Sequence, residues 1–214
     1  DNKEYIVSPH IKNYNLDIFE ILKNKKIISL QGHKNIVRTI RYFINENNYN
    51  EYLISGDDNK IVIIWDITNN YKINYQIDTK YGDMIYSCLL VFPKNNEESY
   101  IITSSYAQSE DIDKSATKIY SLNNGKLIKY LKDLNNNYIY YLISWHNKKN
   151  NNYYIIQFSY QKIVINNLLK EELYSELKQK QNKGHYSGFV YNKDNNDYLC
   201  SSSSNGYVYI WDLY

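Results

Sequence analysis

The sequence predicts an all-β fold, a β-propeller of stacked four-stranded sheets, and three observations support this prediction. The stretch LISGDDNKIVIIWDI at 53–67 aligns without a gap to LCSSSSNGYVYIWDL at 199–213. Weaker copies place residues 19, 65, 120, 166 and 211 at equivalent positions, so that the repeat is 45–55 residues long. Runs such as 60–67 are apolar on successive residues, a pattern that needs cover on both faces of a sheet.

Each repeat is expected to form four short strands separated by polar turns. First strands are expected at 36–44, 85–92, 138–145 and 189–191, and second strands at 52–55, 100–104, 153–158 and 198–202. Third strands end at the position of Trp65 and Trp211, and fourth strands are expected at 27–30, 73–77, 127–131 and 173–177. The single domain 1–214 then divides into a partial blade (1–30), a blade (31–77), a further blade (78–131), a degenerate blade (132–177) and a blade without its last strand (178–214).

The segment 168–178 carries two conflicting signals. Leu169, Leu173 and Leu177 recur at a spacing of four residues, which is typical of an amphipathic helix. The position of the segment in the repeat predicts an outer strand instead. A short helical excursion and a distorted outer strand both remain open at this point.

Composition excludes several classes of protein. The net charge of +2 gives no electrostatic footprint for nucleic acid, so nucleic acid is a less favoured partner than protein. Two cysteines are too few for a disulfide scaffold, and no apolar run approaches the length of a membrane span. An intracellular, cytoplasmic location is expected. The chain opens without a methionine, which indicates an excerpt of a longer protein.

No catalytic, metal or cofactor motif stands out. The four histidines (residues 10, 33, 146 and 185) lack the spacing of zinc ligands. The acidic insertion 106–115 begins like a calcium loop but has Ala116 and Leu122 where that loop needs Gly and Glu. Serines 201–204 lack a nucleophile elbow, and the seven glycines form no phosphate loop. We therefore expect no enzyme activity, no metal and no cofactor.

The pairs Gly32-His33…Trp65-Asp66 and Gly184-His185…Trp211-Asp212 resemble the signature of WD40 repeats. The resemblance implies a buried hydrogen-bond network in each sharp repeat. Its members would be His33, Ser55, Asn59 and Trp65 in one repeat, and His185, Ser201, Asn205 and Trp211 in the other. Asn59 and Asn205 stand where the family has an aspartate, and Asp58 is an alternative in the first network.

The resemblance also implies a ring of seven blades. The four to five blades of this segment are then part of a larger ring, whose missing blades come from the rest of the chain or from another chain.

Function is expected at the face that carries the loops before each first strand. Aligning the first strands puts Arg38, Tyr86, Tyr140 and Ser187 at one position just inside that face, with Lys34, Asp83 and Tyr186 around them. Arg and Tyr are enriched at the energetic centres of protein interfaces.

This pattern predicts a non-enzymatic scaffold for protein–protein interaction that binds a protein or peptide. The alternatives are an RNA- or ribosome-associated propeller, and a regulatory domain of a larger enzyme such as a kinase or a ubiquitin ligase subunit.

Overall fold

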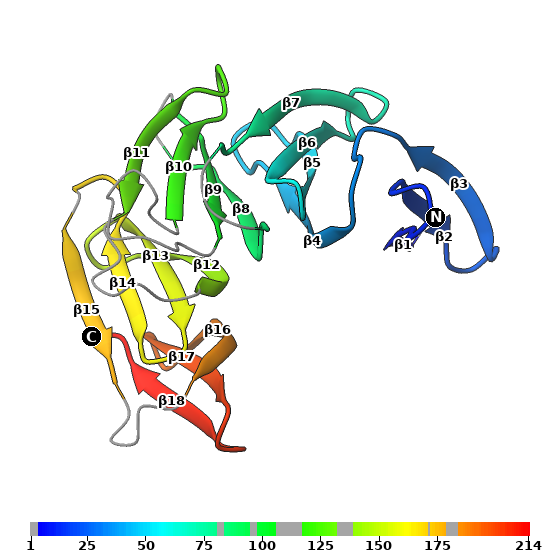
Figure 1. Cartoon of the computed structure of the whole chain (residues 1–214). Helices are drawn as coiled ribbons and strands as arrows, with labels where there is room; N and C mark the ends of the chain where they lie inside the picture. The colour runs from blue at the N-terminus through cyan, green and yellow to red at the C-terminus, as the bar shows by residue number, and fades with distance from the viewer. Residues whose placement is uncertain are drawn as a thin grey trace.

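The computed structural model describes residues 4–80, 84–94, 98–105, 117–131, 139–170, 172–178 and 184–214. These residues form eighteen strands in five antiparallel sheets and contain no helix, which confirms the predicted all-β class. The sheets follow one another along the chain in an open arc, with the two termini in the sheets at its two ends (Figure 1). The architecture is that of a partial propeller.

Each sheet is a meander in which consecutive strands pair. The first sheet contains β1 (Tyr5–Pro9), β2 (Leu16–Glu20) and β3 (Lys25–Leu30). The second contains β4 (Val37–Ile44), β5 (Glu51–Asp57), β6 (Ile61–Asp66) and β7 (Lys72–Asp78). The third contains β8 (Ser87–Val91), β9 (Tyr100–Ser104), β10 (Thr117–Ser121) and β11 (Leu127–Leu131). The fourth contains β12 (Ile139–Asn147), β13 (Asn152–Ser159), β14 (Ile163–Asn167) and β15 (Leu173–Leu177), and the fifth β16 (His185–Lys193), β17 (Asn196–Ser203) and β18 (Val208–Asp212).

The hydrophobic core lies between the sheets rather than under one of them. Val62, Ile63 and Ile64 follow one another in β6 and are fully buried. Ile63 packs with Leu16 of the first sheet, whereas Val62 and Ile64 pack with Ile101 of the third. Both faces of the second sheet are thus covered, which is the arrangement that the unbroken apolar run requires.

Arg41 in β4 connects three sheets at the inner edge of the arc. Its Nη1 donates to the carbonyl of Leu142 in β12 at 2.6 Å, and its Nη2 donates to the hydroxyl of Ser87 in β8 at 3.1 Å. The guanidinium carbon lies 4.1 Å from the ring centroid of Tyr141. Burial lowers the pKa of Arg41, but the hydrogen bonds and the aromatic face stabilise the cation.

The ambiguous segment 168–178 is resolved in favour of a strand. Leu173–Leu177 pairs with β14 as β15, with a register shift at Ile165/Asn166. Leu169 and Leu173 remain about half exposed, so the leucines do not form one buried face. The helical alternative is wrong for these residues, and the distorted outer strand is what the structure contains.

Candidate functional site

Three tyrosines from three consecutive sheets form a contiguous row on the loop face. Tyr86 precedes β8, Tyr140 lies in β12 and Tyr186 lies in β16. The ring centroids of Tyr86 and Tyr140 are 6.1 Å apart, and those of Tyr140 and Tyr186 are 5.2 Å apart, both edge to face. This geometry is the favourable one for aromatic pairs, because a ring edge meets the negative face of its neighbour. Burial raises the pKa of Tyr140, and the two neighbouring phenols add to the effect.

Arg38 continues the row into the second sheet. Its guanidinium donates from Nε and Nη2 to the two carboxylate oxygens of Asp58, at 2.6 and 2.8 Å. This paired hydrogen bond raises the pKa of Arg38, and Tyr86 contributes in the same direction. We call Arg38, Tyr86, Tyr140 and Tyr186 the Arg–Tyr row.

The remaining residues predicted for this face lie around the row or cannot be placed. Ser187 is exposed and its hydroxyl lies 3.1 Å from that of Ser202. Lys34 is exposed in the segment before β4. Asp83 and the acidic insertion 106–115 lie outside the described residues. The structure thus brings together the aromatic and guanidinium groups that the strand alignment predicted.

A buried network supports the loop face beneath Arg38. Trp65 donates from Nε1 to the hydroxyl of Ser55 at 3.0 Å, and this hydroxyl lies 2.7 Å from Nε2 of His33. Nδ1 of His33 lies 2.8 Å from a carboxylate oxygen of Asp57. All four side chains are almost fully buried, and each polar group has a partner.

Asp57, and neither Asn59 nor Asp58, supplies the acidic member of this network. This corrects the sequence prediction. Asn59 instead accepts a hydrogen bond from the amide of Asn35 at 2.8 Å. The second oxygen of Asp57 accepts from the backbone N–H groups of Asn59 and Ile61, both at 2.9 Å. The carboxylate therefore also holds a tight turn, in which Lys60 adopts a left-handed φ of 68°.

The last sheet carries a shorter version of the network. Trp211 donates to the hydroxyl of Ser201 at 2.9 Å, and this hydroxyl lies 3.3 Å from Nδ1 of His185. The amide of Asn205 donates to the hydroxyl of Tyr209 at 2.7 Å. Ser203 occupies the position of Asp57, and its buried hydroxyl has no partner among the described residues. Burial lowers the pKa of His185, which favours the neutral imidazole.

A second acidic network joins the fourth and fifth sheets and was not predicted. Asp197 accepts hydrogen bonds from Trp145 at 2.9 Å, from Tyr214 at 2.7 Å and from Asn192 at 2.9 Å. Burial acts to raise the pKa of Asp197, but these bonds outweigh it and lower that pKa. Burial, together with the bond to Asp197, raises the pKa of Tyr214 to about 12. Trp145 lies near the end of a first strand, β12, whereas the tryptophans of the repeat signature lie in third strands. The repeat alignment therefore gave no reason to expect an acidic partner for it.

The described residues contain no cluster of His, Cys, Asp or Glu that could hold a metal ion. No helix in the described parts of the chain is long and apolar enough to cross a membrane.

Comparison with protein families agrees with the sheet pattern and the buried networks. The family model described as "WD domain, G-beta repeat" matches residues 24–66 and 178–212. These two segments are WD40 repeats. The two matched segments contain the His33 and His185 networks, and the two sheets between them have the same four-stranded antiparallel order as the second sheet. A search of curated proteins finds no match to the chain. WD40 repeats generally serve as scaffolds for protein interaction and are typically non-catalytic.

Proposed function

We propose that this WD40 chain is a non-enzymatic scaffold that binds a protein or peptide partner through the Arg–Tyr row. The observation that carries the proposal is the continuity of the row. Four side chains from four sheets meet at one face, although they are about 50 residues apart in sequence. Rigid aromatic rings and a planar guanidinium offer much contact area and lose little entropy on binding.

The structure beneath the row is suited to holding these side chains in place. Arg38 is fixed by both oxygens of Asp58, and the adjacent Asp57 belongs to the buried network. Tyr140 is fixed between two other rings. A preorganised surface of this kind reduces the cost of ordering side chains when a partner binds.

Two further features belong to the proposal. The exposed apolar side chains of Phe189, Val208 and Ile210 in the fifth sheet suit contact with a further blade, which the rest of the chain or another chain would supply. A cytoplasmic location agrees with the two free cysteines, Cys88 and Cys200.

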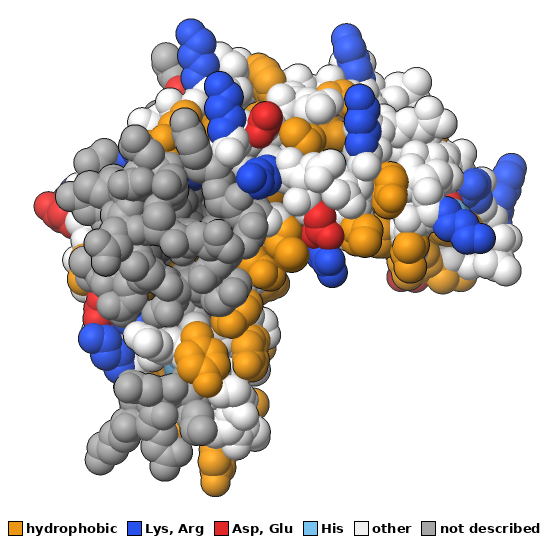
Figure 2. Space-filling model, viewed as in Figure 1, with side chains coloured by type: hydrophobic (Ala, Val, Ile, Leu, Met, Phe, Trp, Pro, Cys, Tyr) orange, Lys and Arg blue, Asp and Glu red, His pale blue; other side chains and the backbone are white. Residues whose placement is uncertain are grey.

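Protein is favoured over RNA as the partner because the basic side chains are dispersed. Figure 2 shows lysine and arginine side chains scattered over the convex edge of the arc, and hydrophobic side chains along its concave edge. RNA binding would favour a continuous basic surface and a steep dependence on salt.

Site-specific photo-crosslinking tests the proposal. In one variant a photoreactive phenylalanine replaces Tyr140 in the row. In the control it replaces Tyr42, which is half exposed and lies towards the opposite end of β4 from Arg38. We expect a defined protein to crosslink at position 140 and not at 42. The purified partner should then bind the triple variant Arg38→Ala/Tyr86→Ala/Tyr140→Ala at least about tenfold more weakly than the unchanged chain.

The fold of the triple variant is checked by circular dichroism and thermal unfolding. Equal crosslinking at both positions, or unchanged affinity of a folded triple variant, would show that the row is not the binding surface. Ribonuclease-sensitive capture through the row would favour the RNA-associated alternative.

A further inference from the structure

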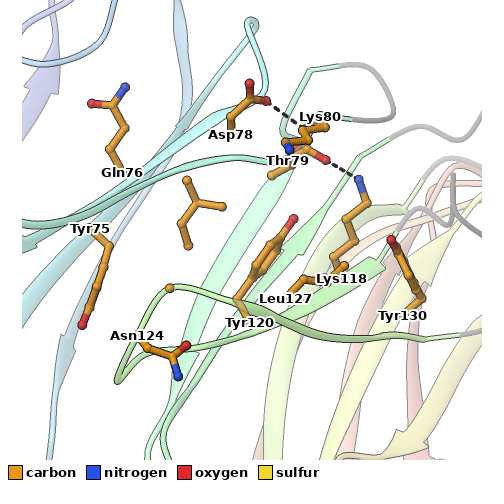
Figure 3. Close-up of a pocket in the computed structure, with 12 residues that line it drawn as sticks. Tyr75, Gln76, Asp78, Thr79, Lys80, Lys118, Tyr120, Asn124, Leu127 and Tyr130 are labelled. Atoms are coloured by element: carbon orange, nitrogen blue, oxygen red, sulfur yellow. Dashed lines mark hydrogen bonds between the residues drawn. The ribbon is translucent and has the colours of Figure 1, made fainter.

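A cavity of about 480 Å³ lies on the outer side of the arc, between β7 of the second sheet and β10 and β11 of the third (Figure 3). Its apolar lining includes Ile77, Tyr120 and Leu127. The cavity is separate from the Arg–Tyr row, since none of the row residues lines it.

Two contacts between the sheets set the width of this cavity. At one end the hydroxyl of Tyr75 donates to the carbonyl of Asn123 at 2.5 Å. Gly125, at a φ of +69°, packs against the same ring, so closely that an added Cβ would lie 3.1 Å from it. At the other end Nζ of Lys118 donates to the carbonyl of Thr79 at 2.7 Å. The opening is therefore a built feature of the joint between two sheets.

One end of the cavity is positively charged. Of the residues that the structure describes, Lys118 and Lys80 line this end together with one carboxylate, Asp78. Lys60 lies close enough to act on Lys118 electrostatically. Burial lowers the pKa of Lys118 to about 8, Lys60 adds to this effect and Asp78 opposes it. The ammonium group thus remains mostly protonated at neutral pH in a place where an anion stabilises it.

Thr79 gives a second, independent indication of a ligand. It lines the same end of the cavity and is 96% buried, since only 4% of its surface is exposed. Its Oγ1 has no hydrogen-bond partner among the described residues. A buried hydroxyl without a partner is costly, and an oxygen acceptor in the cavity removes this cost.

We propose that the cavity between β7 and β10–β11 binds an acidic peptide segment, with one carboxylate at Lys118 and Thr79 and a neighbouring apolar side chain against Tyr120 and Leu127. The polar and apolar parts are arranged in this order along the cavity. Lys118 and Thr79 lie at one end of the cavity, and Tyr75 and Asn124 lie at the other end (Figure 3). Tyr120 lies between the two ends.

A peptide fits this lining better than a free small acid. Asn124 also lines the cavity and carries a carboxamide, whereas the carboxamide of Gln76 points away from Tyr75 and Tyr120 (Figure 3). A carboxamide offers a donor and an acceptor, which matches the N–H and C=O groups of a peptide backbone. A single carboxylate also fits better than a phosphate dianion, because Asp78 adds a negative charge beside the two lysines.

Fluorescence anisotropy with two labelled peptides tests the proposal. The peptides are fluorescein-Gly-Gly-Leu-Glu-Leu-Gly-amide and the same peptide with Gln in place of Glu. With the full chain we expect the Glu peptide to bind at least about tenfold more tightly, which is the effect of one charge-assisted hydrogen bond. Lys118→Met should abolish the difference between the peptides. Lys126→Met, an exposed lysine in the turn of the same sheet, should preserve it.

Further variants keep the result interpretable. Thr79→Val retains the shape of the side chain and should weaken binding of the Glu peptide severalfold. This variant provides a second test if Lys118→Met fails to fold. Equal binding of the two peptides, no binding at millimolar peptide, or an undiminished preference in a folded Lys118→Met variant would overturn the proposal. Equal affinity for free 4-methylpentanoate would overturn the assignment to a peptide.

The site does not depend on the Arg–Tyr row. The triple variant of the row should bind the Glu peptide as the unchanged chain does. Failure of either proposal is therefore distinguishable from failure of the other.

Discussion

Asp57 and Asp58 are adjacent carboxylates in opposite surroundings, and they predict opposite responses to removal. Asp57 is fully buried and accepts hydrogen bonds from the backbone N–H groups of Asn59 and Ile61 and from His33. Asp57→Ala leaves these three groups without their acceptor inside the protein. Hydrogen bonds to a charged group contribute about 1.5–3 kcal/mol each and are not additive, so we expect a loss of about 3–5 kcal/mol.

Asp57→Asn should cost less, about 1–2 kcal/mol. Because Trp65 donates to Ser55, every group is satisfied when Ser55 donates to Nε2 of His33 and Nδ1 of His33 donates to the carboxylate. An amide in place of the carboxylate still accepts hydrogen bonds, but its NH₂ group cannot accept one. At least one member of the chain of donors then loses its partner.

Urea unfolding followed by tryptophan fluorescence measures both effects, and amide hydrogen exchange at residues 59 and 61 reports the turn directly. Asp58→Ala is the matched control. Asp58 pairs with the half-exposed Arg38, so its removal should cost less than about 1 kcal/mol. Equal shifts of the unfolding midpoint for Asp57→Ala and Asp58→Ala would refute the reasoning.

The remaining predictions concern the other buried polar groups. Arg41→Met removes one hydrogen bond to the third sheet and one to the fourth, so it should lower the free energy of unfolding by about 2–3 kcal/mol in urea titrations. A change below about 0.5 kcal/mol would contradict this. Trp145→Phe retains an aromatic ring but removes the N–H donor to Asp197, so the loss in the same assay should be about 1–2 kcal/mol, and an unchanged midpoint would contradict it. The pKa of Lys118 is about 8 in the folded chain against 10.5 for an ordinary lysine, so stability should rise with pH between these values, relative to Lys118→Met. Urea unfolding of both proteins from pH 7 to 10.5 tests this. A difference in the free energy of unfolding between the unchanged chain and Lys118→Met that stays constant over this range would contradict it.

The sequence was sufficient to predict the sheets because the repeat carries a physical signal along most of its length. Runs such as Val62–Ile64 need cover on both faces, and stacked sheets are the arrangement that provides it. The alignment of first strands likewise predicted that Tyr86 and Tyr140 lie together, since equivalent positions in neighbouring blades meet at the same height. Segment 168–178 was ambiguous, because the spacing of its leucines fits a helix while its pairing with β14 is decided by the neighbouring strand.

The details of the polar networks could not be predicted in the same way. Three acidic or amide side chains, Asp57, Asp58 and Asn59, follow one another at the end of β5, and a change of one position decides which side chain points inward. The bond of Trp145 to Asp197 crosses between two sheets and depends on their separation. The cavity beside Lys118 also exists only where two sheets meet, so no single repeat contains its pattern.

The contacts of Arg41 have a consequence for how the sheets act together. A stack in which each sheet touches only its neighbours behaves as a one-dimensional array. In such an array the effect of unfolding one sheet on the stability of another becomes smaller with each interface between them. Arg41 extends from the second sheet to the carbonyl of Leu142 in the fourth and bonds Ser87 of the third on the way. This link across the inner edge of the arc fixes the local curvature, and it couples the second sheet directly to the fourth as well as to its neighbour, the third. The three middle sheets should therefore melt as one cooperative unit, with the terminal sheets fraying first.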